Sequence, residues 1–590
     1  MLAAPPDPSG RRPRSSAATF VFWGVGGAAL LYASWAAWRR SWVCDDAFIS
    51  FRYAENLVHG LGLVFNPGER VEGYSNFLWT LWSAFGLFLG LDAERWSKLA
   101  GIACTVGALG TLAWHSWTNR GEASGPARWI PIAAVLGAIL PDWNLFATSG
   151  LETSLYTLQI VLLYVVLARA EIGTGRAVAA GLLLAAAAMT RPDGLIVAAA
   201  VGVYLLVVDR RRPRALIVLA VAFLIAWVPY TWWRVSYYGD FFPNTYYAKS
   251  AAQAWISQGV VYCVLYFARY WPLLVGLALV ALTWPRTARE DDEAARMALA
   301  RWRRRASLAA MVSLVFTAYV VRVGGDFMFA RFLIPVTPLF LVLFELGVAR
   351  FAPGRPVFQW VWVAIAAAGI VFTPYPLPRD PFGAVRGIVF EPNYYTPEAT
   401  GRTRDRGLAL RPFFAGLPVR MAFFGGEARL VYYARPRIAI ECATGLTDRT
   451  IAHQQLKQRT RIGHEKLASL EYLLDDRRAH LSVFPGTAKV LQLEKAIPTV
   501  EIEMNGVRGQ VLTWDPPLMD SMRQRGALVP DFPAELDRLL AEPGLVVIWG
   551  GWSVREKLRR FYFGHVEDPI REALLEQRVR EAGGGAPTLH

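Results

Sequence analysis

Long apolar segments recur through the first two thirds of this chain and constrain its fold more than any other feature. A helix needs about 20 mostly apolar residues to cross a bilayer. We identify candidate spans at residues 19–38, 97–117, 129–146, 153–169, 177–190, 194–208, 214–234, 259–284, 307–322, 332–349 and 357–376. We therefore predict a polytopic α-helical membrane protein with about 11 transmembrane helices.

Positive charge is concentrated in the short loops between these segments. The formal net charge is +15, and much of it lies in "NRGEASGPAR", "DRRRPR", "PRTAREDDEAARMALARWRRR" and "ARFAPGR". These loops all fall on the cytoplasmic side, as the positive-inside rule requires, if the N-terminus is cytoplasmic and the apolar segment 76–91 does not cross. We therefore predict that 76–91 is an interfacial helix and that the C-terminal region is extracytoplasmic. This distribution of charge also argues against nucleic-acid binding.

The N-terminal segment is interpreted as an uncleaved first span. Basic residues in "GRRPRSS" precede an apolar stretch from Thr19 to Trp38. That stretch is too long for the apolar region of a signal peptide, and no clear cleavage site follows it. The four cysteines show no metal-binding or redox spacing. The sequence leaves open whether Cys44 and Cys442, which share the outer side in this topology, form a disulfide.

The chain divides into three regions in this interpretation. Residues 1–376 form a transmembrane module with a large first outer loop at 41–96. Residues 377–575 are predicted to form a C-terminal extracytoplasmic α/β domain. There, "VRMAFFGGEARLVYYARPRIAIECATGL" alternates strand, glycine turn, short helix and strand, "LEYLLDDRR" indicates a helix, and "AHLSVF" and "GLVVIWGG" indicate strands. Residues 576–590 are predicted to be a disordered tail.

Two adjacent carboxylates follow the first span directly, in "CDDAFISFRYAENLVHG". We predict a helix over 45–58 with Asp45 at its N-cap. Asp45, Arg52 and His59 are seven residues apart and share one face of that helix, which suits the binding of a charged headgroup. The structural alternative is that Asp45 only caps the helix and Asp46 only interacts favourably with the helix dipole.

Polar motifs recur in the other loops on the same side of the membrane, in "SGLETS", "TRPDG", "YYGDFFPNTYYAK" and "GGDFMFARF". Each also has a structural explanation. Glu152 suits a helix cap, Arg191 an anchor at the membrane surface, and the tyrosines an aromatic belt. Arg331 opens a span, and Asp326 follows two glycines in a turn. Caps and anchors do not explain why these motifs gather on one side, and the gathering favours a polar pocket.

These motifs resemble those of bacterial polyprenyl-phosphate-dependent glycosyltransferases of the GT-C fold. The stretch "DDAFISFRYAENLVHGLGLVFNPGERVEGYSNFLWTL" is similar to their first outer loop, and "SGLETSLYTL", "TRPDG", "YYGDFFPNTYYAK" and "GGDFMFARFLIP" are similar to later motifs. The resemblance is closest to mycobacterial terminal β-(1→2)-arabinofuranosyltransferases. It covers most of the chain and is most specific over residues 44–80.

This resemblance implies a multi-pass enzyme of the bacterial inner (plasma) membrane, embedded in the lipid bilayer. Its donor would be a sugar on polyprenyl phosphate, with arabinofuranose as the family's best-known sugar. Its acceptor would be a polysaccharide of the cell envelope outside the cytoplasm. The transfer would be inverting, with a carboxylate that removes the proton of the acceptor hydroxyl and stabilises positive charge on the sugar.

The resemblance also implies roles for the motif residues. Asp45 is the first candidate for the base and Asp46 the second. The leaving lipid phosphate requires cations, for which the candidates are Arg52, His59, Lys249, Arg331 and Arg191. Candidates for sugar and acceptor binding are Tyr53, Tyr74, Glu152, Asp240, Asn244, Tyr246, Tyr247 and Asp326. No ligand set specific to a metal is visible, so the presence of a divalent cation is left open.

Two other functions fit a polytopic protein with polar pockets. One is a flippase or other transporter of lipid-linked sugars, although the chain has no visible inverted repeat and few charges inside its spans. The other is a non-catalytic glycan-assembly protein that keeps the fold. Loss of transfer with unchanged donor binding in an Asp45→Asn variant would separate the enzyme from this last alternative.

Overall fold

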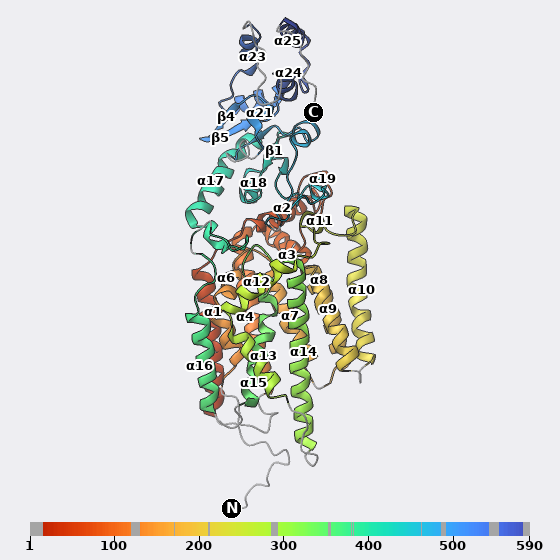
Figure 1. Cartoon of the computed structure of the whole chain (residues 1–590), viewed down its shortest axis with the longest axis vertical. Coiled ribbons are helices and arrows are strands. Elements are labelled where there is room, and N and C mark those ends of the chain that lie inside the picture. The colour runs from red at the N-terminus through yellow and green to blue at the C-terminus, as the bar shows by residue number, and fades with distance from the viewer. Residues whose placement is uncertain are drawn as a thin grey trace, which may run out of the picture.

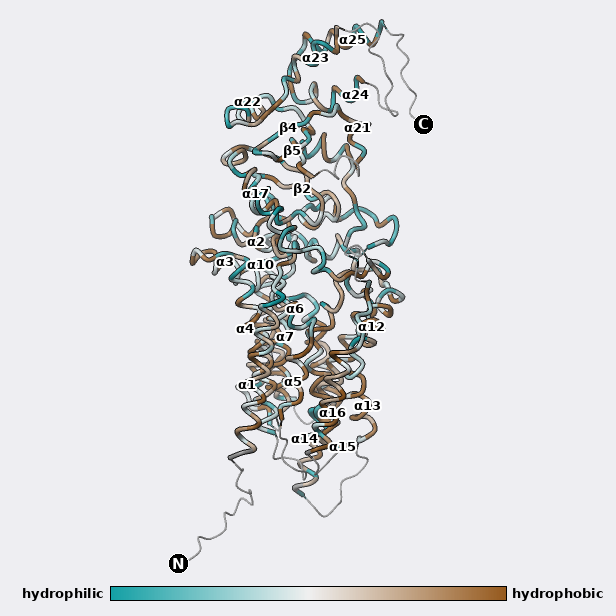
Figure 2. The backbone as a smooth tube through the Cα atoms, turned by 90° about the vertical axis from the view of Figure 1, so that its left-hand side faces the viewer, coloured by the Kyte–Doolittle hydropathy of each residue, from teal (hydrophilic) through white to brown (hydrophobic). Residues whose placement is uncertain are grey.

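The protein is elongated, with a helical bundle at one end and a smaller region of strands and helices at the other (Figure 1). Apolar residues dominate the bundle, and hydrophilic residues are more frequent in the second region (Figure 2). The computed structural model describes residues 16–119, 130–169, 171–209, 213–284, 293–351, 356–378, 380, 383–461, 463–484, 491–541 and 554–581.

The bundle is built from helices that follow the predicted spans. They are α1 (Ser16–Arg39), α4 (Ala93–Asn119), α5 (Ile132–Ala138), α6 (Pro141–Phe146), α7 (Thr153–Leu167), α8 (Thr174–Thr190), α9 (Gly194–Val203), η1 (Tyr204–Val208), α10 (Pro213–Tyr238), α12 (Ile256–Arg269), α13 (Pro272–Leu282), α14 (Glu293–Val323), α15 (Thr337–Phe351) and α16 (Pro356–Phe372). One continuous apolar cluster joins them. Burial of these side chains between helices fixes the positions of the loops at the bundle end.

Fewer of these helices have the length of a full span than the sequence predicts. Among the described residues, five helices are long and apolar enough to cross a membrane, and six if the bent pair α12 and α13 counts as one span. The other predicted spans coincide with shorter apolar helices, such as α7, α8 and α16. The figure of eleven crossings therefore stays a prediction.

Two predicted spans are interrupted at prolines. The span at 129–146 is divided into α5 and α6, and α6 begins at Pro141. The span at 259–284 bends by 88° between α12 and α13, where α13 begins at Pro272. Proline cannot donate a backbone hydrogen bond and restricts the residue before it, so it ends one helix and begins the next. An apolar count alone does not detect these interruptions.

The first outer loop contains two helices, as the sequence predicts. Helix α2 (Asp46–Val58) follows the paired carboxylates, and α3 (Phe77–Phe88) corresponds to the predicted interfacial helix. Trp79 of α3 donates its indole N–H to the carbonyl of Gly150 at 2.8 Å. Trp82 and Phe88 on the same helix are exposed, which suits a helix at a membrane surface.

The second region contains a five-stranded mixed sheet in the order β2-β1-β3-β5-β4. Its strands are β1 (Arg420–Phe423), β2 (Ile438–Glu441), β3 (Leu481–Ser482), β4 (Val500–Met504) and β5 (Val507–Val511). β1 pairs in parallel with β2 and β3, whereas β5 is antiparallel to β3 and β4. The short helix α18 (Ala428–Ala434) connects β1 to β2. This arrangement confirms the strand, turn, helix and strand predicted for that stretch.

Two C-terminal predictions need correction or lie outside the described residues. The tail predicted from residue 576 begins too early, because α25 (Pro569–Glu581) continues as a helix to Glu581. The strand predicted at "GLVVIWGG" lies outside the described residues, as does the remainder of the tail. The division at residue 376 stays a prediction.

The first outer loop shares its apolar core with the sheet. Tyr53, Phe65 and Tyr74 of the loop belong to the same buried cluster as Phe423 of β1 and Ile440 of β2. Polar contacts reinforce the junction. Asn66 exchanges two hydrogen bonds with the backbone of Ala439 in β2, at 2.9 and 3.0 Å. The loop is therefore held between the bundle and the sheet.

Candidate active site

The two adjacent carboxylates at the start of α2 have different surroundings. Asp45 is only 3% exposed. Its two carboxylate oxygens accept the backbone N–H groups of Ala428 at 2.8 Å and of Arg429 at 2.9 Å. Asp45 occupies the predicted N-cap position of α2 but makes no capping hydrogen bond there. It instead satisfies the first N–H groups of α18, and so it joins the first outer loop to the sheet region.

The buried position of Asp45 affects its protonation. Burial raises the pKa of Asp45 to about 6, while the N–H groups of Arg429 and Ala428 oppose this rise. Each oxygen of Asp45 already accepts one backbone N–H, and the residue is only 3% exposed, so Asp45 is less accessible to a third group than an open carboxylate would be.

Asp46 is more accessible and faces a cavity. Its side chain is 37% exposed, and its nearest cationic partner is Arg331, with Nη1 of the arginine 3.9 Å from Oδ2 of the aspartate. Asp45 and Asp46 both line a cavity of about 310 Å³. Pockets for small ligands begin at about this size. Of the two carboxylates, Asp46 has the oxygens available to a ligand.

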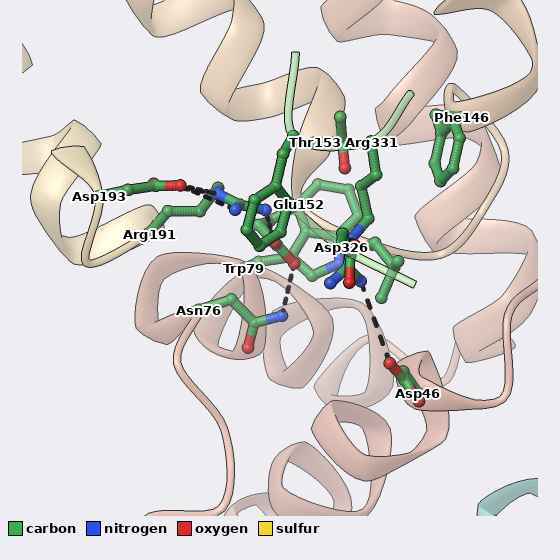
Figure 3. Close-up of polar contacts among 12 residues, drawn as sticks. Asp46, Asn76, Trp79, Phe146, Glu152, Thr153, Arg191, Asp193, Asp326 and Arg331 are labelled. Carbon is green, nitrogen blue, oxygen red and sulfur yellow. Dashed lines mark hydrogen bonds and ion pairs between the residues drawn. The ribbon is translucent and has the colours of Figure 1, made fainter. Parts of the chain in front are cut away.

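Behind Asp46, the polar motifs of several loops form one buried network (Figure 3). Asn76 donates to Glu152 at 2.9 Å, and Glu152 pairs with Arg191 at 3.0 Å. Arg191 also pairs with Asp193 at 2.8 Å. Arg191 has an extended backbone because Pro192 follows it, so α8 ends at Thr190. The "TRPDG" motif thus directs its arginine towards the start of α7.

Arg331 connects this network to Asp46. It forms an ion pair with Asp326 at 2.5 Å, in addition to the longer contact with Asp46 (Figure 3). Ala330, the residue before it, is fully buried and has a left-handed backbone with φ of 68°. Such a conformation costs roughly 1–2 kcal/mol in an L-residue and persists where the surroundings enforce it. The strained turn places the guanidinium between the two aspartates.

Lys249 is a further cation close to this group. Burial lowers the pKa of the Lys249 amine, while Asp326 and Asp46 raise it. Across the described parts of the chain, the Lys249 ammonium forms no hydrogen bond or ion pair. Asn244 positions the segment that carries it by donating to the carbonyls of Gly445 at 2.7 Å and Leu446 at 2.8 Å. An ammonium group held here without a partner suits the binding of an anion.

The cavity is closed on its other side by residues from the C-terminal part of the chain. They come from the turn η3 (Glu391–Tyr394), helix α17 (Pro397–Phe414), the loop after β1 and the loop around residue 461. The lining residues with acidic, basic or aliphatic hydroxyl side chains are Asp45, Asp46, Glu391, Thr400, Thr403, Arg429, Arg461 and His464. Sequence reasoning did not identify Glu391, Arg461 or His464. For Glu391 the available signal was a single acid beside three aromatic residues in "VFEPNYY", and Arg461 and His464 had none.

Two predicted phosphate ligands lie away from this network. Arg52 is buried and donates to the carbonyls of Phe65 and Pro436, each at 2.8 Å. His59 lies at the exposed end of α2, where its Nδ1 is 2.7 Å from the carbonyl of Glu55. The three residues of the predicted face therefore have different surroundings: Asp45 lines the cavity, Arg52 is buried against the sheet region and His59 is exposed.

Most predicted sugar-binding residues have structural contacts instead. Tyr53 and Tyr74 are in the shared core, where Tyr53 donates to Val71 at 2.5 Å. Asp240 pairs with exposed Arg449 at 2.9 Å. Tyr246 stacks on Phe242, and Tyr247 stacks on His453. Of the predicted sugar-binding residues, only Glu152 and Asp326 belong to the network behind Asp46.

Among the described residues, this site contains neither a disulfide nor a cluster of metal-binding side chains. Cys44 and Cys442 are free and buried, so the disulfide that the sequence left open is not formed. No group of three or more His, Cys, Asp and Glu side chains suited to a metal ion occurs within the described ranges. A divalent cation stays an open question.

Comparisons with known proteins identify relatives over part of the chain. No protein-family model matches the sequence. The terminal beta-(1->2)-arabinofuranosyltransferase of Mycobacterium tuberculosis is 31% identical over 340 residues, which covers 53% of this chain and 53% of that protein. The protein of the same name from Corynebacterium glutamicum is 33% identical over 357 residues, 54% of this chain and 49% of that protein. The chain therefore spans about half the length of these curated relatives. They confirm the resemblance noted from the motifs.

A solved structure confirms the type of fold. The structure of ArnT from Cupriavidus metallidurans bound to undecaprenyl phosphate matches with a TM-score of 0.51 at 13% identity, covering 84% of this chain and 98% of that chain. Its apo state matches with a TM-score of 0.50 at 15% identity. At this identity the likeness is one of fold. The chain has the predicted GT-C type of fold, and its apolar helices fit a polytopic membrane protein.

Proposed function

We propose that this chain is an inverting glycosyltransferase of the bacterial inner membrane. It moves a sugar from a polyprenyl-phosphate donor to a glycan of the cell envelope outside the cytoplasm, and arabinofuranose is the best candidate for the sugar. The names of the two curated relatives support the sugar and the activity. The observation that carries the proposal is the position of Asp46, which lies between a group of buried cations and an open cavity.

Asp46 acts as the base in this proposal, ahead of Asp45. A general base must be within hydrogen-bond reach of the hydroxyl that it deprotonates. Asp46 is accessible from the cavity, and the cation with which it forms an ion pair, Arg331, is 3.9 Å away. Asp45 is only 3% exposed, and each of its oxygens accepts a backbone N–H, from Ala428 and from Arg429, so it is less accessible to an acceptor hydroxyl than Asp46. Asp45 therefore acts as a positioning residue that holds α2 against α18.

Arg331 and Lys249 receive the departing phosphate. Cations that are already in place stabilise the charge that develops on a leaving phosphate without reorganisation. The Lys249 ammonium has no hydrogen-bond or ion-pair partner among the described residues, and Arg331 is held by its pair with Asp326. Arg191 is occupied by Glu152 and Asp193, so we assign it to the support of this site. Donor phosphate and acceptor hydroxyl then approach Asp46 from opposite sides.

The same arrangement supports the proposed orientation. In Figure 1 the sheet and this site lie at one end of the bundle, and the arginine-rich start of α14 lies at the opposite end. The positive-inside rule places that start, with Arg296 and Arg301, in the cytoplasm. The site and the sheet region are then extracytoplasmic, where an envelope glycan is available.

The test is transfer from labelled decaprenyl-phosphoarabinose to a short arabinan acceptor. We expect product from wild type and at least about a hundredfold loss in folded Asp46→Asn, because loss of a general base typically costs this much. Lys249→Ala should weaken donor binding about tenfold or more, because it removes a charged partner of the phosphate.

Asp240→Asn is the matched control, since Asp240 is an outer-side acid paired with exposed Arg449 away from the site. Normal transfer by folded Asp46→Asn would refute the assignment of the base. An absence of transfer by wild type with any polyprenyl-phosphate sugar, together with movement of the lipid across the bilayer, would instead favour a flippase.

A further inference from the structure

Glu391 is the least explained charged residue of the cavity. It begins the turn η3, just after a short backbone bridge between Met328 and Val389. In that bridge Val389 donates to the carbonyl of Phe327 at 2.8 Å, and Phe329 donates to the carbonyl of Val389 at 3.1 Å. The bridge fastens Glu391 to the loop that carries Asp326 and Arg331. Glu391 is thereby held in the wall of the cavity that Asp46 also lines.

One carboxylate oxygen of Glu391 has no hydrogen bond. Glu391 is only 5% exposed, and its Oε1 accepts the hydroxyl of Tyr395 at 3.1 Å. Its Oε2 is buried and has no hydrogen-bond partner among the described residues. The nearest cation, Nη2 of Arg461, is at 3.6 Å, which is too long for a hydrogen bond. Buried polar atoms are almost always hydrogen-bonded, so this exception requires an explanation.

The neighbouring arginine shows the same deficiency. Nε of Arg461 is also buried without a hydrogen-bond partner in the described structure. The guanidinium lies 4.5 Å from the centre of the Phe327 ring, so it is held in place by the aromatic face. An unsatisfied acceptor and an unsatisfied donor therefore lie side by side in the wall of one cavity.

The charge of the cavity limits what can satisfy these two atoms. Asp45, Asp46 and Glu391 contribute three carboxyl groups to the cavity. When ionised, each of them repels a further negative charge that enters it. Arg429 is occupied by Glu94 at 3.2 Å and by the carbonyl of Val43 at 3.0 Å. A phosphate is thus better served by Lys249 and Arg331. A neutral ligand with adjacent hydroxyl groups fits this cavity, because one hydroxyl donates to Glu391 and the next accepts from Arg461.

We propose that Glu391 and Arg461 form a subsite that binds two adjacent hydroxyl groups of the acceptor sugar and presents a third hydroxyl to Asp46. This proposal rests on the proposed transferase function and adds to it the side from which the acceptor enters. Tyr394 lines the same cavity and offers aromatic surface to the carbon face of a sugar ring. The C-terminal part of the chain therefore takes part in selecting the acceptor.

The raised pKa of Glu391 is consistent with this role. Burial raises it to about 7, and Asp46 adds to the rise, while Arg461 opposes it. A carboxyl group that is partly protonated at neutral pH is able both to donate to and to accept from sugar hydroxyls.

The test compares Glu391→Ala and the conservative Glu391→Gln with wild type in acceptor titrations. We expect Glu391→Ala to raise the KM for an arabinan oligosaccharide by about tenfold to a hundredfold, because it removes a hydrogen bond to a charged group. Glu391→Gln keeps an acceptor oxygen and should have a smaller effect. For both variants, kcat at saturating acceptor and the KM for the donor should stay within about threefold of wild type.

Glu427→Gln is the matched control. Burial also raises the pKa of Glu427 to about 7, but its side chain does not line the cavity. A second readout uses an acceptor that lacks the hydroxyl adjacent to the reacting one. Wild type should bind this analogue more weakly than the full acceptor. Glu391→Ala should bind the two acceptors almost equally, because the carboxylate that would contact the hydroxyl is already absent.

Three results would overturn the subsite. They are an unchanged acceptor KM in Glu391→Ala, a fall in kcat alone, and an equal penalty for the analogue in wild type and variant. If wild type transfers no sugar, the proposed function fails, and direct calorimetric titration with the oligosaccharide decides the subsite separately. Binding by wild type that is weakened in Glu391→Ala would support it, and equal binding or none would refute it.

Discussion

At the scale of single residues, the contrast between Asp45 and Asp46 leads to a prediction about pH. The pKa of Asp45 is raised from 3.8 to about 6 by burial. The folded protein therefore keeps this proton up to about pH 6, whereas the unfolded chain releases it near pH 4. Because the folded state binds more protons between these values, the free energy of unfolding falls as the pH rises through them. This rise in the pKa of Asp45 lowers the free energy of unfolding by roughly 3 kcal/mol between low pH and pH values above 6.

Asp45→Asn removes this proton-binding group. We expect the melting temperature of wild type to fall relative to that of Asp45→Asn as the pH rises from about 4 to about 6. Both melting temperatures are measured in the same detergent. The difference between the two proteins isolates Asp45 from the other titrating groups. A difference that is constant over this range, or that moves in favour of wild type, would contradict the assigned burial of the carboxyl group.

At the scale of elements, the "SGLETS" turn is locked against α2 by a glycine. Gly150 has φ of 79°, and a β-carbon there would lie 2.8 Å from Cβ of Ala47 and 2.9 Å from Cγ1 of Val43. Its carbonyl accepts the indole N–H of Trp79. Gly150→Ala should therefore destabilise the protein by about 2–4 kcal/mol, through the left-handed backbone and the overlap with α2 together.

Gly60→Ala is the control for the backbone contribution. Gly60 has φ of 73°, but a β-carbon there would meet nothing within 4 Å. Gly60→Ala should lower the free energy of unfolding by only about 1–2 kcal/mol. Thermal unfolding and transfer rates of both variants measure the difference. Equal losses in the two variants would mean that the contact between the turn and α2 has no energetic importance.

At the scale of the whole molecule, the C-terminal region is an integral part of the site. Phe65 of the first outer loop is buried against Phe423 of β1, with ring centres 6.3 Å apart. Removal of residues 377–590 would expose this core and release both oxygens of Asp45. We therefore expect the truncated protein to lose binding of donor and acceptor together, and not of the acceptor alone.

A truncation that removes only residues 582–590 is the control, since the last described helix ends at Glu581. It should retain the thermal stability and the donor affinity of the full chain. The measurements are donor binding and acceptor binding on both truncated proteins after purification in detergent. Full donor affinity in the chain that lacks 377–590 would show that the bundle and the first outer loop form the donor site without the sheet.

Local patterns were sufficient for much of the fold. The helix after the paired carboxylates, the helix at 77–88 and the strand, helix and strand around α18 depend on periodicity and turn residues within a few positions. The helix breaks at Pro141 and Pro272 were missed because an apolar window averages over a single proline. Length and composition indicate a membrane helix, but they do not say whether it is straight.

The candidate site was likewise predictable only in part from the sequence. The sequence alone determined that acids, cations and aromatic residues gather at one end of a bundle of apolar helices, because loop charge and hydrophobic length are properties of the chain. Only the tertiary structure decided which of them meet. Asp45 and Asp46 are neighbours in sequence. The backbone of α18, nearly 400 residues away, donates hydrogen bonds to Asp45, whereas Asp46 stays accessible. The tertiary structure also places Glu391 and Arg461, which belong to no sequence motif, in the wall of the cavity. Sequence could not predict this, because contacts with distant segments determine which polar atoms remain available to a ligand.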